Sequence, residues 1–551
     1  MDKTNVRELQ DVVIRFSGDS GDGMQLTGTL FSDTSALLGN GISTFPDYPA
    51  EIRAPQGTVA GVSGFQVHFG SHRELNPGDY CDVLVAMNPA ALKANRKWLK
   101  PGATVIIDGD SITEDHLKKA CFATLDPIAE LKLDEYNVVI PGITTMTRDA
   151  LRETGLDNKS VTKCKNMFAL GICFYLFDRP EAYAFKYIET KFAKKNPAIA
   201  EANKLAIQAG YNYAANTHQF ANTYTVAPAP LEKGTYRSIS GNVATAWGLC
   251  AAAEKAGLPL FCGSYPITPA TVILEELAKR KDLGVKTVQA EDEIAGICTA
   301  IGAAFAGNFA VTTTSGPGLS LKSEALGLAV MTELPLVVVD VQRGGPSTGL
   351  PTKTEQSDLA QALYGRNGEC PVIVVAASSP SDCFHYAFEA GRLAMEHMTP
   401  VILLTDGFIA NGSEPWRIPA MKDYPAITPP IVDEAPEGGF MPYVRNENLA
   451  RGWAFPGKTG LEHRVGGLEK DCVKGCISHD PSNHQKMVRT RAEKVAKAVD
   501  DIPAQAVWGA PEGDLLVVGW GGTRGHLQNA VDQMRAEGKR VSPVSYTHLT
   551  L

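Results

Sequence analysis

Short and almost uninterrupted runs of valine, isoleucine and leucine constrain the fold of this chain more than any other feature. Between residues 238 and 425 these runs are LPLFCG, FAVTTTS, LPLVVVDVQ, CPVIVVAA and TPVILLT, and helical stretches separate them. Strands that are apolar on both faces are typical of a parallel sheet that helices cover on each side. The sequence therefore predicts an α/β fold with a doubly wound domain over 238–425.

The N-terminal part shows the same alternation of strand and helix. DVVIRFSG, CDVLVAM and ATVIIDG predict buried strands, and each is followed by a loop and a helical stretch. We expect a first α/β domain over 1–195. Residues 196–237 are polar and alanine-rich without strand signals, so we expect a connector there.

The C-terminal part is less regular. Residues 426–505 are rich in proline, glycine and charge, which predicts a segment that crosses the surface. DLLVVGWGGTRG begins a further strand–helix unit over 506–541. The last residues, 542–551, read SPVSYTHLTL, continue no recognisable pattern and look like translated vector sequence. We therefore expect this last domain to be truncated.

Composition excludes several classes of protein. A chain of 551 residues is too long for one core, and 44% hydrophobic and 21% charged residues are usual for globular proteins. The net charge of −9 disfavours nucleic-acid binding, and no apolar run reaches the roughly 18 residues of a membrane span. MDKTNVRELQ lacks the apolar core of a signal peptide, which predicts a cytoplasmic protein. The eleven cysteines include no C-x-x-C run, so we expect no iron–sulfur cluster on this chain.

Two prolines stiffen the loop SYPITPAT, which follows the strand LPLFCG. Pro266 and Pro269 fix their own φ angles and push the preceding residues, Tyr265 and Thr268, toward extended geometry. A stiff loop at the end of a strand indicates that something is held against it.

Three acidic residues precede a small, apolar helix in QAEDEIAGICTAIGAAFAG. The helical spacing places the start of the helix near Glu291, so Glu291, Asp292 and Glu293 crowd its first turn. They could merely complement the helix dipole. Glu293, however, stands at the mouth of a closely packed helix, where desolvation would raise its pKa and let it share a proton.

Two further strand ends carry candidate ligand groups. One strand ends at Thr314, and Ser315-Gly316-Pro317-Gly318 turns into a helix that either receives a polar ligand group or is a plain connection. Arg343 follows VVVDVQ, in the crevice where doubly wound sheets bind ligands. It could grip a carboxylate with two parallel hydrogen bonds or form a structural ion pair.

SYPITPAT, EDEIAG, TSGPG and QRGGPSTGLPT, in this order, resemble the α subunit of 2-oxoacid:ferredoxin oxidoreductases, most closely the 2-oxoglutarate type. The resemblance extends to about Val541, and residues 1–195 resemble the γ domain of that family, fused ahead of the α part. It implies a γ-like domain, a pyrimidine-type thiamine diphosphate domain and a truncated domain like the C-terminal domain of transketolase. The implied reaction converts 2-oxoglutarate and coenzyme A to succinyl-CoA and CO₂ and reduces ferredoxin.

The resemblance also assigns roles to residues. Glu293 would contact the pyrimidine of thiamine diphosphate and activate the cofactor, with Glu291 as its rival. The substrate 2-oxoacid would be bound by Thr268, Arg343 and Thr352. Further cofactor contacts would come from Tyr265, Pro266, Thr314, Ser315 and Gly316.

One motif of thiamine enzymes is missing. They hold Mg²⁺ and the diphosphate with G-D-G followed by Asn after about 26 residues. The only G-D-G is Gly21-Asp22-Gly23, and no Asn pair follows at that distance. We therefore expect no metal ligands on this chain. The resemblance implies a β subunit that carries the Mg²⁺-diphosphate site and the iron–sulfur cluster.

A glycine turn opens the first domain, in RFSGDSGDGMQLTG. Gly18, Gly21 and Gly23 lie between a strand and a helix, which suits phosphate contacts. Their order, G-x-x-G-x-G, is not the dinucleotide fingerprint, so NAD binding is disfavoured. The family links this domain, including PAEIRAPQG, to coenzyme A; the alternative is a turn that only packs the helix on its strand.

Several alternatives stay open on the sequence alone. Cys472, Cys476, His479 and His484 could be drawn as a zinc site, although C-x-x-x-C is not a common zinc spacing. The substrate could be pyruvate or a branched-chain 2-oxoacid. The chain could also be a stand-alone transketolase-like enzyme, an NAD-dependent dehydrogenase or a non-catalytic scaffold subunit.

Overall fold

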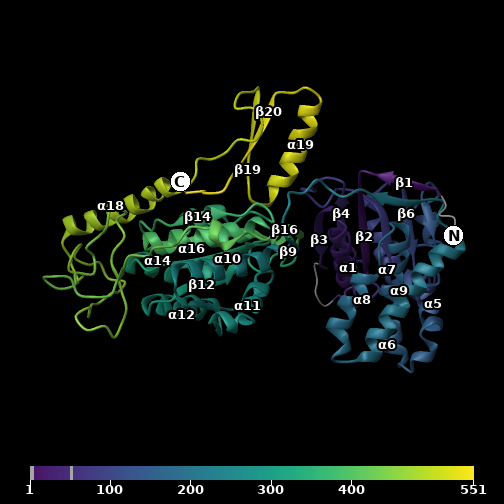
Figure 1. The fold of residues 1–551 in the computed structure, drawn as a ribbon, viewed down its shortest axis with the longest axis horizontal. Helices are drawn as coiled ribbons and strands as arrows, with labels where there is room; N and C mark the ends of the chain where they lie inside the picture. The colour runs from purple at the N-terminus through teal and green to yellow at the C-terminus, as the bar shows by residue number, and fades with distance from the viewer. Residues whose placement is uncertain (1–4, 50–53, 551) are drawn as a thin grey trace. The chain divides into compact units, whose positions relative to one another are not determined.

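The computed structural model describes residues 5–49 and 54–550, and their contacts divide the chain into two compact units. Unit 1 extends to Ser238 and includes the separate segment Gly412–Arg417. Unit 2 comprises Ile239–Asn411 and the chain from Ile418 onward. Figure 1 labels the helices and strands of both units.

A mixed six-stranded sheet forms the centre of unit 1, in the order β3-β4-β2-β5-β6-β7. The three strands predicted for this part are β2, β5 and β6, and they run parallel. β4 pairs antiparallel with both β2 and β3, so the sheet is not parallel throughout. The bounds are β2 (Asp11–Asp19), β3 (Gly41–Asp47), β4 (Val62–Gly70), β5 (Cys81–Ala86), β6 (Leu99–Ile107) and β7 (Asn137–Val139).

Helix α9 (Pro197–Thr217) lies in the stretch expected to be a connector. It packs along α7 (Lys165–Leu176) so closely that a Cβ at Gly210 would lie 1.9 Å from the Phe168 carbonyl oxygen. Ile207 of α9 belongs to the core of unit 1. The alanine-rich composition thus reflects a close helix–helix contact, which a search for strand signals could not reveal.

The other elements of unit 1 surround this core. Its helices are α1 (Met24–Leu37), α2 (Pro89–Asn95), α3 (Glu114–Lys119), α4 (Pro127–Glu130), α5 (Ile143–Ala150), α6 (Asn158–Thr162) and α8 (Ala182–Ile188). Two short parallel strands, β1 (Val6–Leu9) and β8 (Thr223–Val226), pair with each other. β16 (Ser413–Arg417) pairs with β9 (Tyr236–Ser240), which explains why Gly412–Arg417 belongs to this unit.

The main sheet of unit 2 is parallel, as predicted, in the order β11-β10-β12-β13-β15-β14. A change of strand order beside β10 and β12 is the feature that creates a binding crevice in such sheets. The bounds are β10 (Leu260–Ser264), β11 (Lys286–Gln289), β12 (Phe309–Thr314), β13 (Leu336–Gln342), β14 (Ile373–Ala376) and β15 (Pro400–Asp406).

Helices cover this sheet on both faces. Ala310 of β12 and Val338 of β13 share an apolar cluster with α12 and α14. The neighbouring residue Phe309 faces the other way, and a Cβ at Gly391 of α16 would lie 2.8 Å from its ring. The bounds are α10 (Gly241–Ala256), α11 (Thr271–Ala278), α12 (Glu293–Phe305), α13 (Gly316–Leu321), α14 (Ser323–Thr332), α15 (Leu359–Tyr364), α16 (Asp382–His397) and α17 (Gly407–Asn411).

The segment 426–505 is more deeply packed than its charge indicated. Besides β17 (Ile431–Val432) and β18 (Trp453–Ala454), it holds the 17-residue helix α18 (Pro481–Lys497). Its Lys494 and Arg445 reach the carboxylate of Glu333, which is only 1% exposed, at 2.5 and 2.5–2.6 Å. Burial alone would raise the pKa of Glu333, but these two cations lower it to about 2. Two of the charges in this segment are therefore buried partners of one carboxylate, while others, such as Asp433 and Glu434, are exposed.

The last strand–helix unit has the predicted elements and one more. β19 (Leu515–Trp520) and α19 (Arg524–Ala536) match the pattern of DLLVVGWGGTRG and the helix after it. Residues 542–546, which belong to the stretch expected to continue no pattern, are part of β20 (Val541–Tyr546), which pairs parallel with β19.

Candidate active site

Three neighbouring strands of unit 2 end at one edge of the sheet, at Ser264, Thr314 and Gln342. The loops that follow carry most of the unit 2 residues predicted to bind cofactor or substrate. A hydrogen bond joins two of these loops, because Arg343 Nη1 donates to the Thr268 carbonyl at 2.7 Å. The edge therefore brings the predicted residues of unit 2 together.

The proline loop after β10 is anchored from behind. Asn242 of α10 is buried and donates through Nδ2 to the carbonyl of Pro269 at 3.0 Å. Tyr265 and Thr268 are exposed on the loop, and Pro266 is half-buried. Sequence reasoning missed Asn242, because nothing marks this polar residue in the first turn of a helix of mostly small and apolar residues.

The three acids before α12 have different environments. Asp292 is the N-cap, and its side chain accepts from the Ala295 amide at 2.7 Å. Glu291 is exposed, whereas Glu293 is 8% exposed. A Cβ at Gly318 would lie 2.0 Å from Thr314 Oγ1 and 2.8 Å from Glu293 Cγ, so Glu293 lies against the turn after β12.

A buried lysine lies behind Glu293. Lys322 is fully buried, and its Nζ donates to the Glu293 carbonyl at 2.7 Å. Burial lowers the pKa of its ammonium to about 8, and the nearby Glu293 counteracts this shift in part. A single lysine in GLSLKSEALGL reads as a surface residue, so no sequence signal could have identified it.

The turn after β12 leaves a polar group without a partner. Ser315 is fully buried, and its Oγ accepts or donates no hydrogen bond within the described part of the chain. The next residue, Gly316, has Asp358 directly against it: a Cβ there would lie 2.6 Å from Asp358 Oδ2. Glycine at 316 is therefore required by packing.

Arg343 has a donor to spare at the same edge. It is 8% exposed, Nη1 is used on Thr268, and Nη2 lies 3.5 Å from the Thr348 carbonyl. Its buried Nε has no partner among the described residues. Burial lowers the pKa of the guanidinium, while Glu293 and Asp358 nearby favour its charged form.

The loop after β13 folds back on itself. The Gly344 amide donates to the Lys353 carbonyl at 2.8 Å, and Leu350 donates to the Gly344 carbonyl at 2.8 Å. Thr352, next to Lys353 and half-buried, therefore returns to the chain beside Arg343. This fold explains how two residues nine positions apart can serve one site.

The glycine turn of unit 1 has its own partners. Asp22 Oδ2 accepts from the Asp19 amide at 2.9 Å, and Oδ1 lies 3.0 Å from Lys165 Nζ. Asp19 in turn accepts from the Gly57 amide at 3.0 Å. The turn thus contributes two carboxylates, and the cation beside it, Lys165, is already paired with Asp22. A phosphate contact at Gly18, Gly21 and Gly23 stays a prediction, and part of PAEIRAPQG, residues 50–53, lies outside the described residues.

The zinc alternative gains no support. Within residues 5–49 and 54–550, no three His, Cys, Asp or Glu side chains are placed to hold a metal ion. His484 Nδ1 lies 2.8 Å from Glu469 Oε2 instead. Within the same residues, no helix is long and apolar enough to cross a bilayer.

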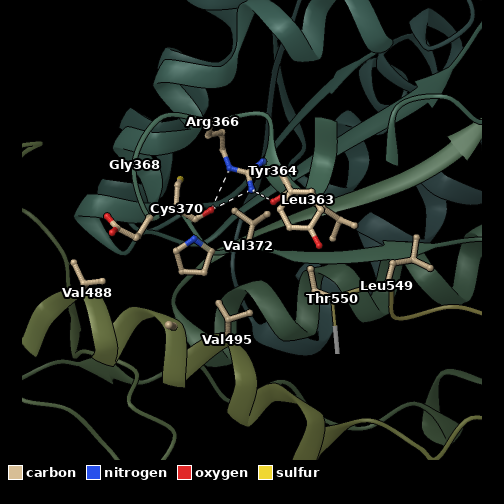
Figure 2. Close-up of a pocket in the computed structure, with 13 residues that line it drawn as sticks. Leu363, Tyr364, Arg366, Gly368, Cys370, Val372, Val488, Val495, Leu549 and Thr550 are labelled. Carbon is tan, nitrogen blue, oxygen red and sulfur yellow. Dashed lines mark hydrogen bonds between the residues drawn. The ribbon is translucent and has the colours of Figure 1, made fainter. Parts of the chain in front are cut away.

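A cavity of about 500 Å³ lies elsewhere in unit 2, between the chain after α15 and helix α18 (Figure 2). Its lining includes Val372, Val488 and Val495, but none of the predicted site residues. The guanidinium of Arg366 on its wall donates to the carbonyls of Ala362, Leu363 and Cys370. The cavity thus offers mainly apolar contacts.

Comparison with known proteins gives the family. The sequence profile "Pyruvate flavodoxin/ferredoxin oxidoreductase, thiamine diP-bdg" matches residues 252–477, and "Pyruvate ferredoxin/flavodoxin oxidoreductase" matches residues 13–213. The 2-oxoglutarate oxidoreductase subunit KorA of Mycobacterium tuberculosis is 52% identical over 545 residues, which are 98% of this chain and 82% of that protein. The chain belongs to the 2-oxoacid:ferredoxin oxidoreductase family.

Other relatives agree with this assignment. The 2-oxoglutarate synthase subunit KorA of Methanothermobacter marburgensis is 37% identical over 311 residues, 55% of this chain and 78% of that one. The solved 2-oxoglutarate:ferredoxin oxidoreductase from Magnetococcus marinus, with 2-oxoglutarate, coenzyme A and succinyl-CoA bound, superposes with a TM-score of 0.84 at 32% identity. The match covers 98% of this chain and 88% of the Magnetococcus chain. The predicted family and the α/β fold class, with its thiamine diphosphate domain, are confirmed.

Proposed function

We propose that this chain is a subunit of a 2-oxoglutarate:ferredoxin oxidoreductase and supplies the substrate site and the pyrimidine side of the thiamine diphosphate site. The enzyme converts 2-oxoglutarate and coenzyme A to succinyl-CoA and CO₂, and the two electrons released reduce ferredoxin. Two relatives are named for 2-oxoglutarate, and the Magnetococcus enzyme holds 2-oxoglutarate, coenzyme A and succinyl-CoA. These names favour 2-oxoglutarate over pyruvate and branched-chain 2-oxoacids.

One observation carries the proposal: the edge gathers a buried carboxyl group and two buried polar groups without partners. Glu293 lies against Thr314 and Gly318, while Ser315 Oγ and Arg343 Nε have no partner among the described residues. A buried donor left unpaired costs free energy of about 1–3 kcal/mol, unless a ligand pairs with it. The residues present therefore fit a polar cofactor and an anionic substrate.

The chain's own residues then have separate tasks. Thiamine diphosphate, when bound, supplies the carbon that attacks the carbonyl of the 2-oxoacid. Glu293, buried beside Thr314, would share a proton with a pyrimidine nitrogen of that cofactor. Further cofactor contacts come from the flanking residues Tyr265, Pro266, Thr314, Ser315 and Gly316.

Arg343 binds the carboxylate next to the substrate carbonyl. Its planar guanidinium suits a carboxylate, and the Thr268 carbonyl fixes its orientation through the 2.7 Å hydrogen bond. Thr268 and Thr352 complete the substrate contacts from the two loops. A 2-oxoglutarate molecule has a second carboxylate, for which a cation from the β subunit is expected.

The remaining half of the site belongs to a β subunit. The G-D-G…Asn motif for Mg²⁺ and the diphosphate is not found in the sequence, and neither is a cysteine pattern for the cluster. Helix α12 presents an uncharged outer face at helical spacing, with Ile294, Cys298 and Gly302 exposed. This face, beside Glu293, suits contact with the partner that completes the cofactor site.

The test is 2-oxoacid-dependent reduction of methyl viologen by the chain coexpressed with its β subunit. We expect Glu293→Gln to lower kcat by about 10²-fold or more, because the shared proton is lost. Arg343→Lys should raise KM for 2-oxoglutarate by about 10–100-fold, because lysine cannot form two parallel bonds. Glu291→Gln is the matched control and should stay within about twofold of wild type, because Glu291 is exposed.

Each outcome separates the alternatives. Full activity in Glu293→Gln would move the activating role to Glu291 or off this chain, and an inactive, cofactor-loaded wild-type complex would favour the scaffold. Higher activity with pyruvate or 2-oxoisovalerate than with 2-oxoglutarate would show that one of these is the preferred substrate. The family assignment sets aside the NAD-dependent dehydrogenase and the stand-alone transketolase-like enzyme.

The predicted parts of the chain keep their roles in this proposal. We assign residues 1–195 to the γ-like domain, where coenzyme A would bind, and 238–425 to the pyrimidine-type domain. The crossing segment 426–505 joins the latter to the domain beginning at 506. The location we propose is the cytoplasm.

A further inference from the structure

Two carboxyl groups meet at the base of the substrate-binding loop, defined here as residues 343–357. Asp340 lies in β13, two residues before the strand ends, and Asp358 follows the loop. The two carboxyl groups approach each other at this edge, because Asp340 pairs across the sheet with Thr314 and the Asp358 oxygens lie against Gly316, two residues after Thr314. Burial and the Asp358 charge both favour the protonated form of Asp340, and two carboxyl groups can hydrogen-bond to each other only when one of them carries a proton.

No other group replaces that proton. Asp340 is fully buried, and neither of its oxygens accepts a hydrogen bond from an N–H or hydroxyl among the described residues; the same holds for Asp358 Oδ2. On the strands beside β13, the residues opposite Asp340 are the uncharged Thr314 and Leu404. An ionised Asp340 would therefore be a buried charge beside a like charge.

The charged groups around the pair favour a particular arrangement. Asp358 faces Arg343, which favours its ionised form, and Glu355, which opposes it. Among the described residues, Asp358 is the ionisable group that acts on Asp340, and burial together with this like charge raises the pKa of Asp340 well above its usual range. Asp340 is thus the protonated donor, and the Asp358 carboxylate is the acceptor that faces Arg343.

This contact closes the loop at its base. The Asp358 amide also donates to Gln342 Oε1 at 3.1 Å, so both contacts join the end of the loop to the strand that it leaves. Asp358 touches the cofactor side as well, because it lies against Gly316. The position of Asp358 therefore links the loop that carries Arg343 and Thr352 to the turn at Ser315.

We propose that Asp340 and Asp358 share one proton and act as a positioning pair that holds the substrate-binding loop closed. The proposal deepens, and rests on, the proposed role of Arg343 in binding the substrate carboxylate. Loss of the proton puts two negative charges in contact and opens the loop. Because only the closed loop binds substrate, the apparent KM rises as the closed fraction falls, by up to about tenfold per pH unit.

The decisive variant is Asp340→Asn, whose amide donates to Asp358 without needing a proton. In the assembled enzyme, as the pH rises above the usual range of a carboxyl group, we expect KM for 2-oxoglutarate to rise in wild type and to stay flat in Asp340→Asn. Asp358→Ala should have a high KM throughout. Glu355→Gln, which removes a carboxylate of the same loop outside the pair, should keep the rise.

Hydrogen exchange of residues 343–357 tests the pair without any catalysis. We expect the protection of these residues, corrected for the intrinsic exchange rate, to fall with pH in wild type but not in Asp340→Asn. Equal pH dependence in both proteins, or a flat wild type, would overturn the proposal. If Asp340→Asn fails to fold, Asp358→Asn serves instead, since its amide can pair with either form of Asp340 and should likewise be flat.

The two readouts also separate the two proposals. A fall in protection that KM follows supports the positioning pair and the role of Arg343 together. A fall in protection with KM unchanged supports the pair and overturns the role of the loop in substrate binding. Methyl viologen reduction by Arg343→Lys provides the independent check on that role.

Discussion

The glycine turns after β2 and β12 differ in how their charged groups are paired. At Gly21 in unit 1, Asp19 and Asp22 accept from nearby amides and Asp22 pairs with Lys165, although the buried Asn166 Oδ1 beside Gly23 has no partner among the described residues. At Gly316 in unit 2, Ser315 Oγ and the charged Arg343 Nε are buried without a partner among the described residues. The charged groups of the first turn are thus already used, whereas the second leaves a charged donor for a ligand.

The strongest test of this contrast is Gly316→Ala. The added Cβ would lie 2.6 and 2.7 Å from the two oxygens of Asp358, too close for either group to stay in place. We expect kcat/KM to fall by about 10²-fold, since shifts near 1 Å in an active site cost that much. Steady-state kinetics of the assembled enzyme gives the measurement.

The matched control for that substitution is Gly327→Ala in α14, where an added Cβ meets nothing within 4 Å. It should stabilise the helix by about 0.5–1 kcal/mol and leave the kinetics alone. Wild-type kinetics in Gly316→Ala would show that packing does not require glycine at this position.

The second test concerns Lys322, whose pKa of about 8 lies below the usual 10.5 of lysine. Between these values the folded protein binds fewer protons than the unfolded chain, so the free energy of unfolding rises with pH. The rise can reach about 1.4 kcal/mol per pH unit, and it is lost as the pH falls through about 8. Lys322→Met lacks this gain, so it should be more destabilising at about pH 9.5 than at about pH 7. Urea unfolding at both pH values checks this, and equal destabilisation would contradict it.

The third test breaks the internal pairing of unit 1. Asp22→Ala removes the hydrogen bond to the Asp19 amide and the contact with Lys165, whose side chain is 16% exposed, like that of Asp22. We expect a loss of about 1–2 kcal/mol, read as faster hydrogen exchange in the first turn of α1. Asp115→Ala, which breaks an exposed pair with Lys119, should cost much less, because solvent screens this pair. Similar losses in both variants would show that the turn is not specially stabilised.

The smallest effect is expected for Gly21→Ala. An added Cβ would meet only Gln56 Nε2, at 3.5 Å, so the substitution is tolerated by packing. If the turn pairs its own groups and binds no phosphate, KM for coenzyme A should change by less than about twofold. A tenfold rise would establish the turn as a coenzyme A contact and show that both glycine turns bind ligands. Gly23 is unsuitable for this test, because its φ of +76° already favours glycine.

The parts of the site that follow from the order of the strands along the chain could be predicted. Apolar runs gave the strand ends at Thr314 and Gln342, and parallel strands bring such ends to one edge. The choice of Glu293 over Glu291 followed from the small residues after it, and the structure buries the former and exposes the latter. The roles of these residues in catalysis remain predictions.

The parts that depend on long-range burial could not be predicted. Lys322 and Asp358 each read as surface residues, because their charge carries no information on what packs over them. Asp340 stands in an apolar run, and nothing in the sequence shows that it lies beside Asp358, 18 positions later. For the same reason, the sequence does not reveal that Lys494 and Arg445 are buried against Glu333.

The buried carboxylate of Glu333 has a practical consequence for handling the protein. Lys494 and Arg445 hold the long segment after residue 418 onto the sheet from within, through hydrogen bonds of 2.5–2.6 Å. Leaving such a buried charge unpaired costs about 3–5 kcal/mol. A protease that cuts the exposed glycines 438 and 439 would therefore produce two fragments that remain associated. They would separate on a denaturing gel and elute together from a sizing column.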